Sequence, residues 1–421
     1  MTGAAASPTR SRRPASVASL LADVRDVGRD PRRGGYSRFA YTPAELELRT
    51  WFEAEAARRS LDVVTDRNGI LWAWRPGPGG SLDDAVVTGS HLDSVPGGGE
   101  FDGPLGVASA FAALDLLDAR DVRGERPLAI VAFPEEEGGR FGRACLGSQL
   151  MTGEQDPDRV LGLLDADGTS LADALTGAGL DPVHLGRDDE ALRRIGVFVE
   201  LHVEQGRGLV DLDQPVAVAS SILGHGRWRL TVTGEGNHAG ATLMADRRDP
   251  MVAAAQVVVA VRDLARGRPD ARATVGRLQP VPGGTNVIAS RVDLWLDVRH
   301  PDDDVTRALV AQVLESAHAV CVAEGCTVEL VEESYSGQVR FDAGLRDRLR
   351  GVLPDAPVLA TGAGHDAGVL AAHVPSAMLF TRNPTGVSHS PEEHVDDADA
   401  EAGAAALADV LQDLLVPRGH R

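Results

Sequence analysis

Lysine is absent from the 421-residue sequence, so arginine supplies all 42 of its strongly basic side chains. These cations stand against 62 Asp and Glu residues, and the formal net charge is −20. Proteins that bind nucleic acid neutralise phosphates with clustered cations, so this charge balance argues against a nucleic-acid partner. The length of the chain predicts two or three domains.

Cysteines and long apolar runs are also scarce. The three irregularly spaced cysteines are Cys145, Cys321 and Cys326. An odd number of cysteines does not form a disulfide framework, and it predicts a reducing, cytoplasmic location. No apolar run reaches the roughly 18 residues that span a bilayer, so we expect no membrane partner. Arg10, Arg12 and Arg13 precede no apolar segment; we therefore expect no signal peptide and a loose tail over residues 1–15.

What the chain does contain is an alternation of helical and extended patterns from about residue 42. Residues 42–45 have the sequence TPAE, which is typical of an N-cap, a first-turn proline and a capping-box glutamate. They predict a helix that ends near Arg59, and a second helical pattern covers residues 105–119. Short apolar runs that predict buried strands cover residues 85–88, 128–133, 197–201, 358–360 and 377–380. Such strands, separated by helices, predict an α/β fold with a mostly parallel sheet that is covered on both faces.

The middle of the chain has a different pattern. Strand patterns cover residues 227–233, 273–278, 292–299 and 327–332, and helical patterns cover about 250–265 and 303–323. In chain order these segments are β-α-β-β-α-β, which is typical of a ferredoxin-like α+β unit. We therefore expect a second domain over residues 218–332, inserted into a first domain that is formed by residues 1–217 and 333–421.

Side chains that can bind metals follow several of the expected strands. They are His91 after the first run, Glu135, Glu136 and Glu137 after the second, His202 after the third, and His389 after the last. Parallel strands end at the same edge of an open α/β sheet, and ligands bind outside those carboxyl ends, so we expect these side chains to lie close together. Imidazole and carboxylate groups bind cations such as Zn²⁺, so the sequence predicts a metal site at this edge.

Each of these residues has a simpler interpretation when it is taken alone. A histidine at a strand end is more often a polar residue with satisfied hydrogen bonds, and a run of glutamates is usually a solvated face. Asp102 could be a turn aspartate in the segment GGEFDG, and Asp93 could cap the preceding strand. The recurrence of ligand types after four different strands favours the metal site.

Longer motifs give the chain a resemblance to a known family. In chain order they are GSHLDSVPGGGEFDGPLGV, FPEEEGGRFG, FVELHVEQG, GEGNHAGATLMADRRD, GTNVIAS, LDVRH, TGAGHDAG and VSHSPEEH. With these motifs the chain, from about residue 35 to its C-terminus, resembles the hydantoinase/carbamoylase branch of the M20 metallopeptidase-like family. That branch contains allantoate amidohydrolases, N-carbamoyl-L-amino-acid hydrolases and β-ureidopropionases. The resemblance implies a dinuclear metallohydrolase domain with an inserted ferredoxin-like lid and dimerisation domain.

The resemblance also implies a set of metal ligands. One divalent ion would be bound by His91 and His202. The other would be bound by Glu137 and His389, and Asp102 would bridge the pair. The expected cofactor is two divalent ions per subunit, Zn²⁺ or Mn²⁺, for which Co²⁺ or Ni²⁺ could substitute.

The implied catalytic residues adjoin these ligands. Glu136 would be the general base, taking a proton from the attacking water and returning it to the leaving nitrogen. Neighbouring residues on an extended segment point to opposite sides, so Glu136 could face the water while Glu137 binds metal. Asp93 would hold the ring of His91. His238, on the lid, would donate a hydrogen bond to the oxyanion in the active site of the partner subunit.

Five further residues match positions that contact the substrate in the family. Arg227, Asn286 and Arg299 would hold its carboxylate, because an arginine presents a planar fork of donors to a carboxylate. His365 and His225 would contact the rest of the molecule. The expected partners are therefore a small ureido carboxylate and a second copy of the chain, joined through the lid.

The choice of substrate stays open between relatives. Allantoate is our first expectation, because FDGPLGV and the triple glutamate are similar to allantoate-type sequences; an N-carbamoyl-L-amino acid or N-carbamoyl-β-alanine is the alternative. An M20 dipeptidase or aminoacylase is disfavoured by His202, where peptidase relatives generally have a carboxylate. A non-catalytic binding protein on this scaffold is the alternative from a different class. Two departures concern the substrate: residues 240–244 are GATLM where relatives often have GTTPM, and His225 stands where some relatives have Gln.

Overall fold

A computed structural model describes residues 14–416 of the chain. By their internal contacts these residues fall into two compact units. The discontinuous unit runs to Ser220 and resumes at Arg340, and the inserted unit is Ser221–Val339. Each unit has a hydrophobic core of its own.

A mixed sheet of nine strands lies within the described part of the discontinuous unit. Its strands are β1 Asp62–Thr65, β2 Leu71–Arg75, β3 Ala85–His91, β4 Leu128–Phe133, β5 Ile195–Val203, β6 Val216–Ile222, β13 Val339–Arg340, β14 Val358–Thr361 and β15 Ser376–Thr381. Their spatial order is β1-β2-β4-β3-β5-β15-β6-β13, with β14 paired to β6. The central strands β4, β3, β5 and β15 are parallel, whereas β1, β2 and β6 pair antiparallel with their neighbours. The five strands predicted from apolar runs are all present, and the mostly parallel fold class is confirmed.

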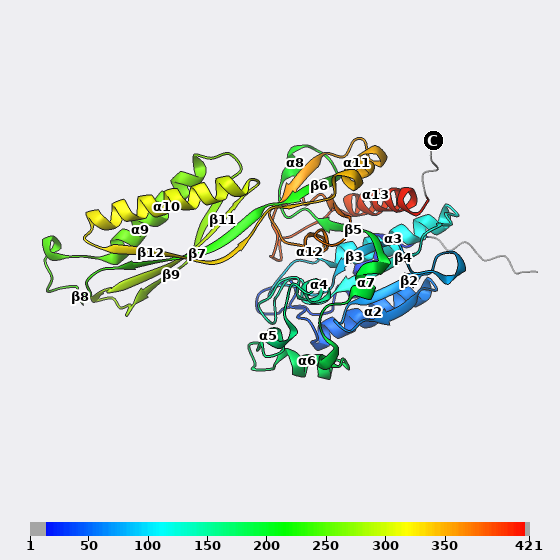
Figure 1. The fold of residues 1–421 in the computed structure, drawn as a ribbon, viewed down its shortest axis with the longest axis horizontal. Helices are drawn as coiled ribbons and strands as arrows, with labels where there is room; N and C mark the ends of the chain where they lie inside the picture. The colour runs from blue at the N-terminus through cyan, green and yellow to red at the C-terminus, as the bar shows by residue number, and fades with distance from the viewer. Residues whose placement is uncertain (1–13, 417–421) are drawn as a thin grey trace, which may run out of the picture. The chain divides into compact units, whose positions relative to one another are not determined.

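Helices cover both faces of this sheet (Figure 1). On one face α3 (Pro104–Ala119) packs against β3 and β5 and is covered by α1 (Val17–Val24) and α13 (Asp397–Leu415). On the other face α12 (Asp366–Leu370) contacts β5 and β15. The other helices described in this unit are α2 Pro43–Arg58, α4 Leu146–Thr152, α5 Pro157–Val160, α6 Leu171–Gly177, α7 Asp189–Arg194, α8 Gly208–Asp211, α11 Ala343–Val352 and the 3-10 helices η1 Pro78–Gly80 and η2 Pro182–His184. Every residue of β3, β4 and β15 is buried, as expected of strands that are covered on both sides.

The N-terminal end of the described chain is anchored to this core. The expected loose tail covered residues 1–15, of which residues 1–13 lie outside the described part. Ala15 donates its N–H to the carboxylate of Asp115 at 3.1 Å, and α1 begins at Val17. The expectation of a loose tail is therefore wrong for Ala15.

The first turn of α2 also differs from the prediction. The helix begins with a proline as predicted, but the side chain of Thr42 makes no capping hydrogen bond. The carboxylate of Glu45 accepts the N–H of Tyr41 at 2.9 Å and pairs with Arg49 at 2.6 Å. The predicted capping box is wrong, because Glu45 is turned to these two partners instead of the N–H of Thr42.

The inserted unit is an antiparallel sheet with two helices on one face. Its strands are β7 Gly224–Thr233, β9 Arg272–Val281, β11 Arg291–His300 and β12 Thr327–Ser336. Its helices are α9 Pro250–Arg266, α10 Asp303–Ala323 and the 3-10 helix η3 Met244–Asp246. A separate pair of short strands is formed by β8 Asn237–His238 and β10 Val287–Ile288. The sheet order is β12-β7-β11-β9, and the chain order is the predicted β-α-β-β-α-β. Trp228, Leu230 and Val232 of β7 are buried in the core with α9 and α10. The residues that alternate with them therefore lie on the other face of the sheet.

Helix α10 is long and apolar enough to cross a membrane by length and composition alone. Charged residues interrupt the segment, so it contains no long uninterrupted apolar run. Leu309, Val313 and Ala317 are buried at helical spacing and belong to the core of the inserted unit. This one-sided burial is the pattern of an amphipathic helix that packs on a sheet.

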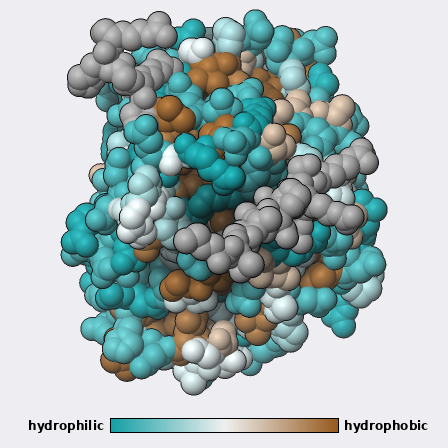
Figure 2. Space-filling view, turned by 90° about the vertical axis from the view of Figure 1, so that its right-hand side faces the viewer, coloured by the Kyte–Doolittle hydropathy of each residue, from teal (hydrophilic) through white to brown (hydrophobic). Residues whose placement is uncertain are grey.

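The face drawn in Figure 2 is largely hydrophilic, and the hydrophobic side chains on it are gathered in several small groups. Such a surface is in keeping with a chain in which a quarter of the residues are charged.

Candidate metal centre

Six of the predicted residues lie at one edge of the sheet in the discontinuous unit. They are His91 at the end of β3, Asp102 before α3, Glu136 and Glu137 after β4, His202 on β5 and His389 after β15. Five of the six form two groups whose potential ligand atoms lie within 4.8 Å of one another, and Asp102 belongs to both groups. The carboxyl ends of the parallel strands place these groups together.

The first group is His91, Asp102 and His202, and all three are buried. Asp102 Oδ1 lies 3.6 Å from His91 Nε2 and 3.2 Å from His202 Nε2, and the two nitrogens are 3.4 Å apart. The Nδ1 atom of each ring lies 3.0 Å from a backbone carbonyl oxygen, that of Asp93 for one ring and that of Val203 for the other. A carbonyl oxygen can only accept, so each Nδ1 carries a proton, and in the neutral ring Nε2 presents a lone pair to the carboxylate.

Three acceptor atoms therefore converge on one buried point. Two imidazole lone pairs and a carboxylate oxygen repel one another unless a cation or a proton lies between them. Two ligands bound at about 2.0–2.1 Å to a tetrahedral ion lie about 3.4 Å apart, and the separations in this group are 3.2–3.6 Å. The donor set and its spacing thus fit a divalent cation.

The second group is Asp102, Glu137 and His389. His389 Nε2 lies 3.5 Å from Asp102 Oδ2 and 3.3 Å from Glu137 Oε2. Glu137 Oε1 is buried and has no hydrogen-bond partner among the described residues. The hydrogen bond that His389 donates to the carboxylate of Glu137 raises the pKa of His389 to about 9. Asp102 thus turns one carboxylate oxygen to each group, which is the arrangement of a bridging ligand.

Asp93 contacts its neighbours in a way that differs from the expectation. Its backbone carbonyl is the partner of His91 Nδ1, while its carboxylate Oδ1 is 3.7 Å from that nitrogen. The carboxylate accepts the N–H groups of Glu136 and Glu137, each at 3.1 Å. Burial raises the pKa of Asp93 to about 7. Asp93 therefore positions the loop of the glutamates as well as the ring of His91.

Glu136 and Glu137 were predicted to point to opposite sides of an extended segment, and this prediction is wrong. Strand β4 ends at Phe133, and the glutamates lie in the bend that follows it, with Glu135 in the left-handed region at φ 55°. The two side chains still lie beside different groups of potential ligands. Glu136 Oε2 lies 3.7 Å from His91 Nε2, beside the first group, whereas Glu137 belongs to the second. Burial raises the pKa of Glu136 well above its usual value.

His365 lies beside this cluster at the start of α12. Its ring centroid is 4.4 Å from that of His202, and its Nδ1 is 4.0 Å from Glu136 Oε1. Burial lowers the pKa of His365 well below its usual value, and Nδ1 has no hydrogen-bond partner in the described part of the chain. His365 also groups with His202 and Glu200, but the oxygens of Glu200 accept hydrogen bonds from a serine hydroxyl and a backbone N–H. We therefore regard His365 as a neutral polar contact rather than as a metal ligand.

Three polar residues beside Asp102 were not predicted from the sequence. Gln205 Nε2 donates to Asp102 Oδ2 at 2.9 Å and lies 3.4 Å from His389 Nε2. Glu393 accepts the N–H of Asp102 at 2.9 Å and so holds the loop that carries it. The hydroxyl of Ser388 lies 3.3 Å from Asp102 and 3.1 Å from Glu393. Their positions next to His202 and His389 in the motifs are the signal that could have found them.

A glycine allows the loop of Asp102 to approach the first group. Gly103 has φ +86°, and a Cβ atom on it would lie 2.4 Å from Cε1 and Nδ1 of His91. A side chain at this position would displace the ring or the loop.

The other predicted residues belong to the inserted unit, where they occupy two places. At the start of β7 and the end of β11, the strand pairing sets Arg227 opposite Asp297 and His225 opposite Arg299. Arg299 Nε lies 2.8 Å from the carboxylate of Asp297, and Arg227 Nε lies 3.7 Å from it. These side chains share the sheet face that α9 and α10 do not cover. Burial lowers the pKa of His225.

The second place is the pair of short strands β8 and β10. His238 lies on β8, and the N–H of Ala239 donates to the backbone oxygen of Asn286 at 3.0 Å. His238 Nδ1 accepts the N–H groups of Gly240 and Ala241 at 3.1 and 3.2 Å. Because Nδ1 accepts, a neutral His238 carries its proton on Nε2, and its exposed side chain can donate from that atom.

The expected convergence of Arg227, Asn286 and Arg299 is not found within one inserted unit. From Arg227, β7 continues to Thr233 before the chain turns toward β8, and a strand advances about 3.3 Å per residue. Arg227 is therefore about 20 Å from the end of β7 that leads to β8. Figure 1 shows β8 at one tip of this unit. A single small carboxylate cannot contact both places on the same chain.

A carboxylate shared between two sets of imidazole and carboxylate ligands defines a candidate two-metal centre of the hydrolytic type. Residues 87–413 match the model of Peptidase family M20/M25/M40, and the chain belongs to this family. The resemblance seen in the motifs is thereby confirmed.

Relatives with known names cover nearly the whole chain. The N-carbamoyl-L-amino acid amidohydrolase of Geobacillus stearothermophilus is 36% identical over 393 residues, which are 92% of this chain and 95% of that protein. The allantoate amidohydrolase of Escherichia coli (strain K12) is 33% identical over 408 residues, 95% of this chain and 97% of that protein. The crystal structure of an amidase of the hydantoinase/carbamoylase family from Burkholderia multivorans has a TM-score of 0.85 at 30% identity, covering 94% of this chain and 97% of that one. The chain is thus a hydrolase that acts on carbon–nitrogen bonds other than peptide bonds.

Proposed function

We propose that this protein is a metal-dependent amidohydrolase that cleaves a ureido C–N bond, with allantoate as its substrate. The products would be ammonia, CO₂ and a ureidoglycine or ureidoglycolate. The main support for the proposal is the position of Asp102. Each of its two carboxylate oxygens faces a separate group of potential metal ligands. Relatives named for allantoate and for N-carbamoyl amino acids support a ureido carboxylate as the substrate class.

The two groups would hold two divalent cations. His91 and His202 would bind one ion together with Asp102. Glu137 and His389 would bind the other with the second oxygen of the same aspartate. Zn²⁺ and Mn²⁺ suit these nitrogen and oxygen ligands, and Co²⁺ or Ni²⁺ could replace them. When bound, the pair supplies an acidified water molecule and polarises the ureido carbonyl.

Glu136 is placed to move the proton. It borders the first group, with Oε2 3.7 Å from His91 Nε2, but it is not a member of that group. Its backbone is held on both sides: its N–H donates to Asp93, and its carbonyl accepts the N–H of Cys145 at 2.6 Å. A carboxylate fixed in this way would accept a proton from the attacking water and return it to the leaving nitrogen.

Two chains would contribute to each active site. One chain would supply Arg227 and Arg299 for the substrate carboxylate. A second copy would supply Asn286 for the same carboxylate and the Nε2 proton of His238 for the oxyanion. The distance of about 20 Å from Arg227 to the end of β7 that leads to β8 supports this division. We therefore propose a homodimer joined through the inserted unit, with that unit, expected over residues 218–332, as lid and dimerisation domain.

The proposal also assigns a role to the discontinuous unit and a location to the protein. The catalytic domain, expected over residues 1–217 and 333–421, would carry both metal ions. We also place the protein in the cytoplasm, and its three free, buried cysteines support that location.

The position of the ureido group relative to the carboxylate limits the substrate. Allantoate and N-carbamoyl-α-amino acids have one carbon between the two groups. N-carbamoyl-β-alanine has a further methylene and would displace the carbonyl by about 1 Å, which can cost on the order of 10²-fold in rate. Allantoate carries a second ureido arm, for which His225 and His365 would supply polar contacts. An N-carbamoyl-L-amino acid is the second candidate, favoured by the 36% identity to a carbamoylase.

The experiment that tests the proposal measures ammonia release from allantoate, N-carbamoyl-L-leucine, N-carbamoyl-L-methionine and N-carbamoyl-β-alanine, before and after chelation. We expect activity that chelation abolishes and Zn²⁺, Mn²⁺ or Co²⁺ restores. We expect kcat/KM for allantoate to exceed that for the carbamoyl amino acids by at least about 10²-fold, because polar groups left unpaired by an apolar side chain are costly. An equal or reversed preference would favour the carbamoylase, and full activity after exhaustive chelation would overturn the metal mechanism.

A further inference from the structure

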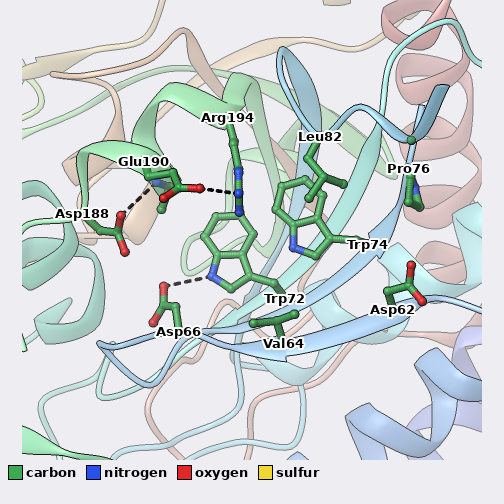
Figure 3. Close-up of a pocket in the computed structure, with 12 residues that line it drawn as sticks. Asp62, Val64, Asp66, Trp72, Trp74, Pro76, Leu82, Asp188, Glu190 and Arg194 are labelled. Carbon is green, nitrogen blue, oxygen red and sulfur yellow. Dashed lines mark hydrogen bonds and ion pairs between the residues drawn. The ribbon is translucent and has the colours of Figure 1, made fainter. Parts of the chain in front are cut away.

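A cavity of about 390 Å³ lies beside the β1–β2 hairpin at the edge of the sheet in the discontinuous unit (Figure 3). Its floor belongs to the hairpin, and its walls come from α7 and from the segment that follows β2. None of the residues that line it is a candidate metal ligand. The volume is in the range of pockets that hold small organic ligands.

Two tryptophans form the floor of this cavity. Trp72 and Trp74 are two residues apart on β2, so they share a face, and their rings are stacked with centroids 5.4 Å apart and planes 8° apart. The strand pairing sets Val64 opposite Trp72 and Asp62 opposite Trp74. An apolar aromatic surface is thus bordered by a carboxylate. Trp72 Nε1 donates to Asp66 at 2.9 Å.

The indole N–H of Trp74 is not satisfied in the same way. The side chain of Trp74 is 5% exposed. No hydrogen bond joins its Nε1 to a described residue, and this atom is not among the fully buried ones without a partner, so it is open to the cavity. Figure 3 shows this nitrogen on the edge of the ring that faces Trp72 and Val64. A donor that is open to the cavity and has no protein acceptor can donate to a ligand, so a ligand that brings an acceptor here would gain a hydrogen bond.

The charges around the cavity are predominantly negative. Four carboxylates line it: Asp62, Asp66, Asp188 and Glu190. The two from α7 and its N-cap are paired with arginines, one with Arg194 and the other with Arg67. The two from the hairpin have no cationic partner in the described part of the chain. The oxygens of Asp66 accept hydrogen bonds from two backbone N–H groups and from Trp72, which leaves Asp62 as the carboxylate that can pair with a ligand. Excess negative charge beside an indole surface favours a cation, which also gains from the aromatic ring.

We propose that this cavity is a binding site for a small organic amine that also carries an apolar group and a carbonyl oxygen. The ammonium group pairs with Asp62, which is exposed at the start of β1. The apolar group packs against the two indoles, and the carbonyl accepts the N–H of Trp74. These three features together describe an amino-acid amide. The site is separate from the candidate metal centre, and it does not depend on which ureido compound that centre hydrolyses.

The test is calorimetric titration of the metal-loaded protein with L-phenylalaninamide, which has all three features. N-acetyl-L-phenylalaninamide, which keeps the ring and the amide but has no charge, is the matched ligand. We expect saturable binding of the amine only. Asp62→Asn and Trp74→Phe should each weaken it by about three- to tenfold. Asp83→Asn, the same charge change at an exposed residue that does not line the cavity, should leave the affinity unchanged.

Three results would overturn the proposal. The first is no saturable binding of L-phenylalaninamide, and the second is equal binding of its acetylated form. The third is binding that Asp62→Asn does not weaken, or weakens no more than Asp83→Asn does. Because Asp62 is exposed, Asp62→Asn leaves the core intact and decides the outcome even where Trp74→Phe fails to fold.

Discussion

Exchanging Glu136 for glutamine separates proton transfer from metal binding. The substitution keeps the size of the side chain but removes its charge and its ability to accept a proton at the attacking water. Glu136 Oε2 lies 3.7 Å from His91 Nε2, and Glu136 belongs to neither group of potential ligands, so Glu136→Gln should retain both metal ions. General-base catalysis contributes about 10²–10⁴-fold to the rate. We therefore expect kcat to fall by that factor, which is about 2.7–5.4 kcal/mol of barrier at 1.36 kcal/mol per tenfold.

The neighbouring residue supplies the matched control. Glu137→Gln makes the same chemical change, but Glu137 is one of three ligands in the second group, with Oε2 3.3 Å from His389 Nε2. This variant should lose metal, and excess metal should restore part of its activity. Bound metal is measured by elemental analysis and turnover by ammonia release. If Glu136→Gln empties the centre while Glu137→Gln keeps it filled, the roles given to the two glutamates are reversed and the reasoning fails.

Three further predictions concern the dimer, the loop of the bridging aspartate and the hairpin. Inactive His238→Ala protein mixed with inactive Glu136→Gln protein should regain activity, because a hybrid dimer has one intact site; no recovery despite proven subunit exchange counts against shared sites. Gly103→Ala should lower the unfolding free energy by about 1–3 kcal/mol, since its Cβ would meet the ring of His91, and an unchanged melting temperature would contradict this. Burial raises the pKa of Asp66 from 3.8 to about 6, so the folded chain binds this proton more tightly than the unfolded chain does, and the stability that this group contributes falls as pH rises from about 4 to 6. Asp66→Asn should reduce that slope in thermal denaturation across the same range, and an identical slope would refute the assignment.

The gathering of the candidate ligands at one edge of the sheet could be predicted, because these residues follow buried strands. The apolar runs before His91 and His202 indicate where each strand ends, and parallel strands bring those ends to one edge. The short hairpin of β1 and β2 was not detected, because its outer strand is only four residues long and largely exposed. The stacked tryptophans of the cavity therefore remained unnoticed at the sequence level.

Contacts between distant loops were beyond the reach of the sequence. Glu393 holds the N–H of Asp102 across 291 positions of the chain, and neither residue indicates the other by its spacing. The carboxylate of Asp93 was expected at the ring of His91, but the loop geometry turns it to backbone N–H groups.

Strand register limits what the motifs of the inserted unit can show. The motifs that contain Arg227, Asn286 and Arg299 give their identity but not their distance along the sheet. The pairing of β7 with β11 sets the two arginines at one end and Asn286 beyond the other. The sequence predicts that these residues converge without indicating which chain supplies each of them, and the register leads to the proposal that two chains do.

The central claim is that one aspartate serves two metal ions. The most direct measurement is the number of divalent ions bound per chain, by elemental analysis after equilibration with Zn²⁺ or Mn²⁺, in the natural protein and in Asp102→Asn. We expect two ions per chain in the natural protein and the loss of both in the variant, because each group loses one of its three potential ligands. Saturation of the natural protein at a single ion, or full retention of two ions by Asp102→Asn, would contradict it.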